Sequence, residues 1–221
     1  MNKILVIATH PDDETLGCGG ALLRHVKNND KVFWLITTKM SDKKIWTKKS
    51  ILLRDKEIKL VSKAYKFKKI YTLEFETIKL DTVPINRITK KLSEVVNDCK
   101  PNIIYCPNET DVHTDHQVTS KACRILGKSF RFPFIKKILS YEVLSETDSN
   151  FFEEKLFKPN YFINIEKYLE KKIKIMKIYK SELKKFPFPR SAEAIRSLAK
   201  IRGSQSNFKN AEAFKLIKEI Y

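Results

Sequence analysis

Short apolar runs alternate with longer segments in which apolar residues recur every three or four positions through the first two thirds of the chain. The short runs predict β-strands at residues 3–8, 31–37, 69–73, 102–106 and 137–143. The longer segments predict helices, whose apolar faces include Leu16, Leu23 and Val26 and, later, Ile85, Ile88, Leu92 and Val95. This alternation is typical of βαβ units, so the pattern predicts an α/β fold, a three-layer sandwich around a mainly parallel, Rossmann-like sheet.

The segment at residues 43–65 predicts one further long helix. The last third of the chain predicts a strand at 161–165, a basic amphipathic helix at 167–184, a helix from a Ser191 cap to about Arg202, and a final helix at 208–221. No internal repeat or flexible linker interrupts the pattern. We therefore expect a single domain spanning residues 1–221, with its C-terminal strand and helices packed as a wall of the active site.

Basic residues strongly outnumber acidic ones, and the formal net charge is +18. A charge of this size attracts polyanions and acidic ligands. The lysines are nevertheless spread along the whole chain, as a general compositional bias would place them, and no nucleic-acid-binding motif accompanies them. We expect no nucleic-acid partner, and we leave open an acidic small-molecule substrate such as a nucleotide-linked or lipid-linked sugar.

Cysteine usage and hydropathy bear on the compartment. The four cysteines are scattered without a Cys-x-x-Cys pair, so the sequence predicts neither a disulfide framework nor a thiolate metal site. No apolar run approaches the ~20 residues of a membrane span, and the run at residues 3–8 is too short for a secretory signal. These features predict a cytoplasmic protein with no transmembrane segment.

The sequence His-Pro-Asp-Asp-Glu at residues 10–14 directly follows the first predicted strand. Ligands bind outside the carboxyl ends of strands in open parallel sheets, so His10 is expected at a functional edge. A structural alternative is that Asp12 and Asp13 only cap the next helix. Capping does not explain three consecutive acidic residues beside a histidine, because their mutual repulsion calls for a cation or strong hydrogen-bond donors nearby.

The glycine-rich continuation at residues 17–20 raises a competing hypothesis, dinucleotide binding. Its spacing does not give Gly-x-Gly-x-x-Gly, and the preceding acidic residues would repel a phosphate at close range. We interpret the glycines as positions where the first helix packs closely against the sheet.

A second polar segment, Asp-Val-His-Thr-Asp-His at residues 111–116, follows the predicted strand at 102–106. Parallel strands bring their carboxyl ends to one edge, so this loop is expected beside His10. Three of the four histidines lie in these two loops. Imidazole and carboxylate without thiolate suit zinc or another first-row ion, and catalytic zinc keeps three protein ligands and one open position. The two loops therefore predict a catalytic metal site.

The same residues resemble the family of zinc-dependent de-N-acetylases that includes N-acetylglucosaminyl-phosphatidylinositol de-N-acetylase and the LmbE-like bacterial sugar deacetylases. Its two motifs are matched at residues 10–20 and 111–116. Weaker similarities extend over nearly the full chain, at Arg54 and Glu57 and at residues 157–163, 189–191, 202–204 and 211–214. One departure follows the second strand, where the family often has Thr-x-Gly and this chain has Thr-Thr-Lys-Met at residues 37–40. Because that loop borders the site, the departure leaves open a substrate preference different from that of the family.

The resemblance implies a role for each matched residue. It makes His10, Asp13 and His116 the ligands of Zn²⁺ and Asp12 the general base. It further implies that His113 stabilises the oxyanion or protonates the leaving amine, that Asp115 orients His113, and that Arg54 binds substrate. The implied reaction is removal of the N-acetyl group from an N-acetylglucosamine-like sugar by attack of water, and analogy with bacterial relatives adds a homo-oligomer as an expectation.

Two other functions remain open at this point. One is a metal-dependent amide hydrolase that acts on a non-sugar or longer-acyl substrate. The other is a basic carbohydrate- or nucleic-acid-binding protein built on an inactive deacetylase scaffold, against which the complete set of ligand residues argues. The sequence does not identify the sugar or its aglycone.

Overall fold

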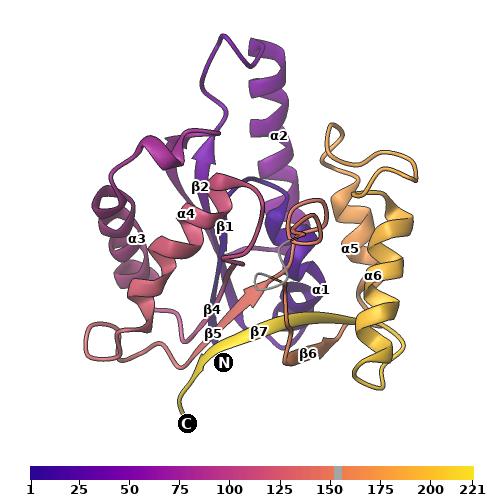
Figure 1. The fold of residues 1–221 in the computed structure, drawn as a ribbon. Coiled ribbons are helices and arrows are strands. Elements are labelled where there is room, and N and C mark those ends of the chain that lie inside the picture. Colours follow the sequence, from indigo (N-terminus) through magenta and orange to yellow (C-terminus); the bar gives the residue numbers. More distant parts are fainter. Residues whose placement is uncertain (152–155) are drawn as a thin grey trace.

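The computed structural model describes residues 1–151 and 156–221. Its centre is a seven-stranded sheet in the order β3-β2-β1-β4-β5-β7-β6 (Figure 1). The strands are β1 (Lys3–Ala8), β2 (Lys31–Lys39), β3 (Lys69–Glu76), β4 (Ile103–Pro107), β5 (Lys137–Tyr141), β6 (Tyr161–Asn164) and β7 (Ala211–Glu219). The helices are α1 (Asp13–Lys27), α2 (Lys48–Tyr65), α3 (Ile85–Cys99), α4 (Thr114–Cys123), α5 (Leu169–Met176) and α6 (Ala192–Ser204), with short 3-10 turns η1 (Leu80–Thr82) and η2 (Arg124–Gly127). Within these described residues, no helix has both the length and the apolar character needed to cross a membrane.

Strands β3, β2, β1, β4 and β5 run parallel, which confirms the α/β class and the mainly parallel sheet. From β1 the chain adds β2 and β3 on one side and then returns to place β4 on the other. At such a switch point a crevice opens beyond the carboxyl ends of the two central strands. The loops at residues 9–12 and 108–113, which follow β1 and β4, therefore meet at this crevice.

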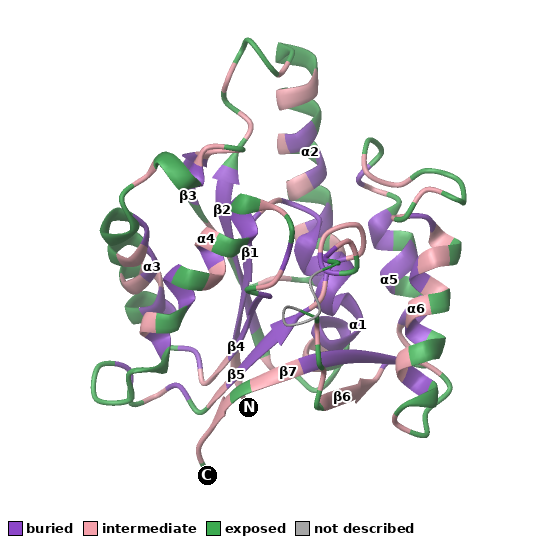
Figure 2. Ribbon diagram, in the orientation of Figure 1, coloured by how far each residue is buried: buried purple, intermediate pink, exposed green. Residues whose placement is uncertain are grey.

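Successive residues of the central strands point to opposite faces of the sheet, and each face is covered by helices (Figure 2). On one face, Ile4 and Val6 belong to an apolar core shared with α1, α2, α5 and α6. On the other face, Leu5 and Ile7 belong to a core shared with α3 and α4. Because β1 is buried on both faces, its sequence is continuously apolar, as expected for a central parallel strand. The expected three layers are confirmed.

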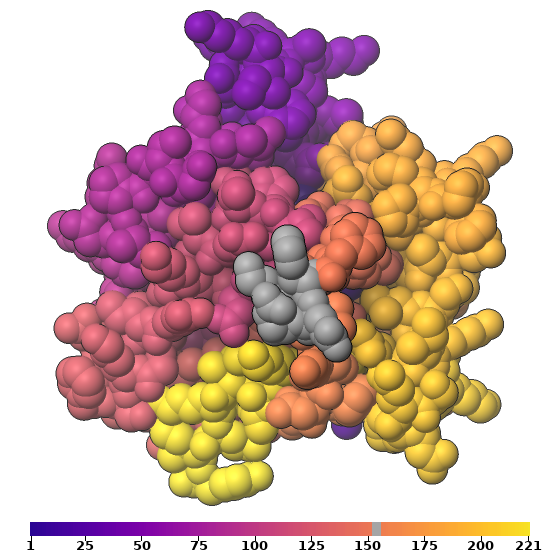
Figure 3. All heavy atoms as spheres, viewed as in Figure 1, coloured from indigo at the N-terminus to yellow at the C-terminus, as the bar shows by residue number. Residues whose placement is uncertain are grey.

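The C-terminal third covers one flank of the molecule (Figure 3). Strand β7 pairs antiparallel with β5 and with β6 and so extends the sheet at that edge. Helix α5 packs on α1, and α6 packs on α5 and β7. Ser191 caps α6 as expected, since its Oγ accepts from Ala194 N at 3.0 Å. This flank places the segment between α5 and α6 beside the β1 loop.

Helix α1 is interrupted at Cys18, where φ is −143°. Two backbone N–H groups beyond the break donate to the Glu212 carboxylate of β7, each at 2.8 Å. Before the break, Lys172 Nζ donates to Leu16 O at 2.8 Å and also to Glu212 at 2.7 Å. The buried Lys172–Glu212 pair thus satisfies backbone groups on both sides of the break and ties the first turn of α1 to α5 and β7.

Three sequence-based expectations were wrong in this structure. The final helix expected at residues 208–221 is strand β7, because pairing with β5 and β6 overrides a local composition that favours helix. The helix expected at 167–184 ends at Met176, after which turns begin and Lys180 N donates to Glu57 Oε1. The helix expected at 43–65 begins at Lys48, because the Thr47 hydroxyl accepts from Ser50 N and caps it there.

Candidate metal centre

The loop after β1 has an unusual backbone that directs several side chains to one point. Asp12 has φ 128° and ψ −28°, a conformation that costs energy for a residue with a Cβ. Its N–H donates to Glu14 Oε2 at 3.0 Å, and His10 N donates to Asp13 Oδ2 at 2.8 Å. These bonds to acidic side chains hold the loop in its strained form and leave His10, Asp12 and Asp13 around the crevice.

The loop after β4 leads directly into helix α4. His113 is the N-cap of this helix, and its Nδ1 accepts from Asp115 N at 3.1 Å. His116 lies in the first turn of α4 and is almost fully buried, at 1% exposure. The cap therefore fixes the helix start, and the helix start carries His116 to the crevice.

The two loops meet as predicted. His10 Nδ1 lies 3.2 Å from His116 Nε2, and His116 Nε2 lies 3.4 Å from Asp13 Oδ2. Ligand atoms around a tetrahedral zinc with bonds of ~2.0–2.1 Å lie ~3.3 Å apart. The donor atoms of His10, Asp13 and His116 all fall within 4.8 Å of one another. Their spacing and chemistry therefore fit one small divalent cation with room for a further ligand.

Each of the two imidazoles is oriented by a carboxylate at its other nitrogen. His116 Nδ1 lies 2.8 Å from Asp111 Oδ2, and Asp111 also accepts from the Thr147 hydroxyl at 2.5 Å. His10 Nε2 lies 3.1 Å from Asp115 Oδ2. A carboxylate behind a histidine fixes its tautomer and makes the free nitrogen a better metal ligand. Asp111, an acidic residue of the second motif, thus supports His116.

Asp115 contacts His113, the residue that the resemblance implied it orients, through its backbone N–H and not through its carboxylate. Its carboxylate accepts from Ile78 N at 2.6 Å, from Leu80 N at 3.0 Å and from His10, while only its backbone N–H contacts His113. A second trio of donors, His10, His113 and Asp115, is also close enough for a metal. That trio is the weaker candidate because the Asp115 oxygens are already used by three donors and His113 Nδ1 is used by the cap.

The electrostatics of the cluster favour a cation. Burial lowers the pKa of His116, but the Asp13 and Asp111 carboxylates outweigh it and raise that pKa to about 9. The site therefore holds a positive charge on His116 at neutral pH, in the position where a metal ion would replace the proton.

His113 behaves differently. Burial, together with the neighbouring His10 and His116 rings, lowers its pKa to about 4. It is therefore neutral near pH 7, and because Nδ1 accepts from Asp115 N, its hydrogen lies on Nε2. His113 can therefore donate a hydrogen bond without carrying a charge, which suits the first of the two roles that the resemblance implied, stabilising an oxyanion, and not the second, protonating the leaving amine.

Residues 5–126, which contain both motifs, match the family described as PIG-L: GlcNAc-PI de-N-acetylase. The match covers more than half of the 221 residues. The chain belongs to this family. The resemblance inferred from the two motifs is confirmed.

Proteins similar to this chain in sequence or in fold carry more than one named activity. The diacetylchitobiose deacetylase of Thermococcus kodakarensis is 24% identical over 234 residues, which cover 100% of this chain and 85% of that protein. The structure of N,N'-diacetylchitobiose deacetylase from Pyrococcus horikoshii has a TM-score of 0.77 at 20% identity, covering 98% of this chain and 84% of that one. GalB, the 4-carboxy-2-hydroxymuconate hydratase of Pseudomonas putida, has a TM-score of 0.75 at 15% identity, covering 100% and 98%. The shared fold therefore does not select the reaction, and the site residues have to.

In this PIG-L family member, Asp12 lies beside the candidate metal site formed by His10, Asp13 and His116, and it is 4% exposed. Burial and the adjacent Asp13 carboxylate raise its pKa well above the usual range for an aspartic acid. Arg190 Nη1 approaches Asp12 Oδ2 at 3.3 Å and also contacts Glu182 at 3.1 Å. Asp12 is thus a basic carboxylate held at the crevice, outside the candidate metal-binding trio.

Arg54 mainly supports the loop after β1. Its Nη1 donates to Pro11 O at 2.7 Å, its Nη2 donates to Ser181 and Glu182, and its Nε lies 3.3 Å from Glu57 Oε2. Only 10% of its side chain is exposed. These contacts fix the β1 loop against the C-terminal flank, although Arg54 also borders the pocket.

A cavity of about 190 Å³ opens over the cluster. Besides the expected site residues it is lined by Met40, from the loop that the sequence placed at the border of the site. It is also lined by residues that sequence reasoning did not place in the site, among them Trp46, Ile78, Glu146, Glu182 and Arg190. Most of them lie on loops without a metal-ligand motif, so their position became visible only in the fold. Glu182 and Arg190 lie on the segment after α5, so the C-terminal flank forms one wall of the cavity.

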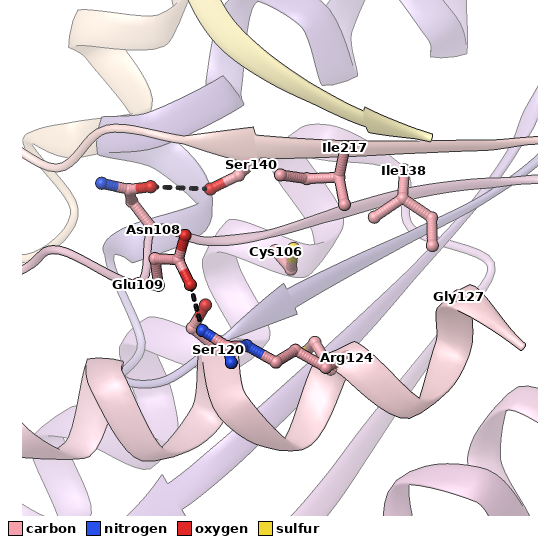
Figure 4. A pocket seen from close by; sticks show the side chains of 10 residues that line it. Cys106, Asn108, Glu109, Ser120, Arg124, Gly127, Ile138, Ser140 and Ile217 are labelled. Carbon is pink, nitrogen blue, oxygen red and sulfur yellow. Dashed lines mark hydrogen bonds and ion pairs between the residues drawn. The ribbon is translucent and has the colours of Figure 1, made fainter. Parts of the chain in front are cut away.

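A larger cavity, of about 370 Å³, lies between α4 and strands β4, β5 and β7, away from the metal cluster. Figure 4 shows its polar side chains turned toward one another, with Asn108 facing Ser140 and Glu109 facing Arg124. These polar groups already bond to each other, and Cys106 and Ile138 contribute apolar surface. The larger cavity therefore does not present a group of free polar side chains that converge on one point, as an active site does. The smaller cavity is the candidate active site.

Proposed function

We propose that the protein is a zinc-dependent hydrolase that removes the N-acetyl group from an N-acetylglucosamine-like amino sugar or its conjugate. The observation that carries the proposal is the spacing of 3.2 and 3.4 Å among His10, His116 and Asp13, at an edge that also holds the unligated Asp12. The family membership of the chain supports the same reaction class. His10, Asp13 and His116 would hold the metal.

When bound, zinc supplies a Lewis acid that polarises the acetyl carbonyl and lowers the pKa of a nearby water. Asp12 accepts a proton from the attacking water and passes it to the sugar nitrogen as the C–N bond breaks, so that acetate and a free amine leave. Its raised pKa suits this role, because a carboxylate of ordinary pKa would hold the transferred proton too weakly. Arg190, 3.3 Å away, orients the Asp12 carboxylate.

His113 serves as a neutral hydrogen-bond donor toward the carbonyl oxygen. Its Nε2–H is fixed by the bond between Nδ1 and Asp115 N, and its ring lies at the cavity. A bound cation would lower its pKa further below about 4, so it carries no proton to spare for the amine near neutral pH. Donors of this kind, aimed at a developing oxyanion, contribute about 10²–10³-fold to the rate of related hydrolyses.

The cavity size limits what is hydrolysed in it. About 190 Å³ accommodates an acetyl group and one sugar ring more readily than a long acyl chain. Arg54 supports the loop beneath this cavity, and its contribution to substrate binding would then pass through the β1 loop and through Glu182. We also expect residues 1–221 to act as one unit, since Glu182 and Arg190 complete the cavity.

The test is product analysis with the zinc-loaded protein and with the chelator-treated protein. N-acetylglucosamine and N,N'-diacetylchitobiose are supplied, and acetate and primary amine are measured together. The expected result is zinc-dependent release of both in equal amounts, with an N-hexanoyl analogue hydrolysed more slowly. Absence of acetate from both sugars, or faster release of the longer acid, contradicts the proposal and favours another amide substrate.

A further inference from the structure

One part of the cavity lining is apolar, and it comes from two loops outside the metal motifs. Met40 and Trp46 lie on the segment between β2 and α2, and Ile78 lies on the segment between β3 and η1. Trp46 is only half-buried, whereas the other tryptophan of the chain, Trp34, is fully buried in the core. Trp46 is thus an aromatic residue that lines the cavity and is not fully used by the core.

The loop that carries Trp46 is held by Asp42. Trp46 N donates to Asp42 O at 2.8 Å, which closes a turn over residues 42–46. The Asp42 carboxylate accepts from Lys44 N at 2.8 Å and from Lys79 Nζ at 3.0 Å. Trp46 is therefore placed by a turn that is itself tied to the loop after β3.

The loop after β3 also holds the metal ligand. Ile78 N and Leu80 N both donate to Asp115, whose carboxylate contacts His10. Lys79, between them, is the residue that binds Asp42. A short segment, residues 78–80, therefore connects the Trp46 turn on one side with the support of His10 on the other. This shared support places the backbone of Trp46 and the carboxylate behind His10 on one connected segment of the crevice rim.

We propose that Trp46 is the stacking platform for the sugar ring and therefore a specificity-determining residue that selects pyranose substrates. The inference rests on the proposed deacetylase function and deepens it. A pyranose ring presents a face of C–H groups, and aromatic faces at the edge of a pocket bind such apolar faces while leaving hydroxyl groups in water. The charged residues of the pocket, Glu146, Glu182 and Arg190, remain for the hydroxyl groups.

The main test compares ring and open-chain substrates in zinc-loaded Trp46→Ala and Trp46→Phe. For N-acetylglucosamine derivatives, Trp46→Ala should raise KM about tenfold with kcat changed less than about threefold, because stacking does not act on the bond that breaks. Trp46→Phe retains an aromatic face and should stay within about threefold of the parent protein. For the ring-opened N-acetylglucosaminitol, all three proteins should have similar KM values.

Ile45→Ala is the matched control, because Ile45 is the adjacent residue, 50% exposed and outside the cavity lining. It should leave KM for both substrates unchanged. Stacking is overturned if Trp46→Ala leaves KM for the ring substrate unchanged, if it raises KM equally for the ring-opened substrate, or if Ile45→Ala raises KM as much as Trp46→Ala does.

A binding measurement separates this inference from the proposed function. Tryptophan fluorescence of the metal-depleted protein is followed while N,N'-diacetylchitobiose is added. Binding should change the emission of the parent protein, and Trp46→Phe, which retains only Trp34, should show no change. If no sugar is deacetylated but this difference is seen, the proposed function fails and the platform stands. If sugars are deacetylated but the emission of the two proteins responds alike, the platform fails and the function stands.

Discussion

Two ends of the sheet use histidine in contrasting ways. At the carboxyl ends of β1 and β4, His10 and His116 each have one nitrogen on a carboxylate, and their other nitrogens face each other at 3.2 Å. At the opposite end, His25 also has a carboxylate partner, with Nδ1 lying 2.8 Å from Asp30. Its Nε2 is taken by the Tyr105 hydroxyl at 2.9 Å. Both ring nitrogens of His25 thus have partners within the protein, and neither is left for a metal.

The comparison teaches that a carboxylate beside a histidine does not by itself make a metal site. At the edge that holds His10 and His116, the second nitrogen of each ring points at another possible metal ligand and not at a hydroxyl of the core. Asp13 adds a third donor there. The energetic consequence differs as well, because the carboxylates raise the pKa of His116 to about 9, whereas burial lowers the pKa of His25 from its usual value despite Asp30.

The largest expected effect comes from His116→Ala. Removal of this imidazole leaves two donors, so zinc content should fall to background and turnover by at least about 10³-fold. The matched control is His25→Ala, which removes a histidine that also has a carboxylate partner but lies at the other end of the sheet. This variant should keep both the zinc content and the turnover of the parent protein. Metal analysis of protein purified without added zinc, together with acetate release, checks the pair. Equal zinc content in the two variants would contradict the assignment of His116 as a ligand.

Asp12→Asn should separate metal binding from catalysis. The variant has nearly the same shape but cannot accept the proton, so kcat should fall about 10²–10⁴-fold while zinc content stays near that of the parent protein. Asp13→Asn, one residue away, is the comparison and should weaken zinc binding instead. If Asp12→Asn loses metal as readily as Asp13→Asn, the division of roles between the two carboxylates is incorrect.

A smaller effect is expected from Asp111→Asn, which weakens support for His116 without removing a ligand. Zinc must displace the proton of His116, so in the parent protein affinity should rise up to tenfold per pH unit until about pH 9. Without the Asp111 charge the pKa of His116 falls, so affinity should level off at a lower pH, at a plateau about 10–100-fold weaker. Competition with a chelator at several pH values measures both quantities. An unchanged pH dependence would show that Asp111 does not act through His116.

Much of the candidate site could be predicted from the sequence because its parts are local. The segments at residues 10–14 and 111–116 follow the apolar strands β1 and β4 within a few residues, and the geometry of parallel sheets then brings them together. The supporting contacts could not be predicted in the same way. Asp115 binds Ile78 N and Leu80 N from another loop, and nothing in the sequence indicates that register.

The C-terminal third was less predictable for a different reason. Residues 208–221 contain Ala, Glu, Lys and Leu, which favour helix locally, but β5 and β6 offer backbone partners on both sides and make the segment a strand. The Glu212 carboxylate of this strand then accepts hydrogen bonds from the backbone N–H groups beyond the break in α1. This contact also depends on the fold. Arg190 and Glu182 reach the cavity only because this flank packs as it does.

The smallest effect on function is expected from the other end of the sheet. In His25→Leu the Tyr105 hydroxyl, on a residue 1% exposed, loses its partner, which should cost about 1–3 kcal/mol of unfolding free energy. Asp30 still accepts from Asn2 N at 2.7 Å, so its carboxylate is not left alone. Denaturant unfolding should therefore show the loss, while zinc content, kcat and KM remain those of the parent protein. The double variant His25→Leu, Tyr105→Phe removes both partners and should recover part of the stability, because no unpaired hydroxyl is then left in the core. A fall in zinc content in His25→Leu would mean that the two ends of the sheet are coupled and that the contrast between them does not hold.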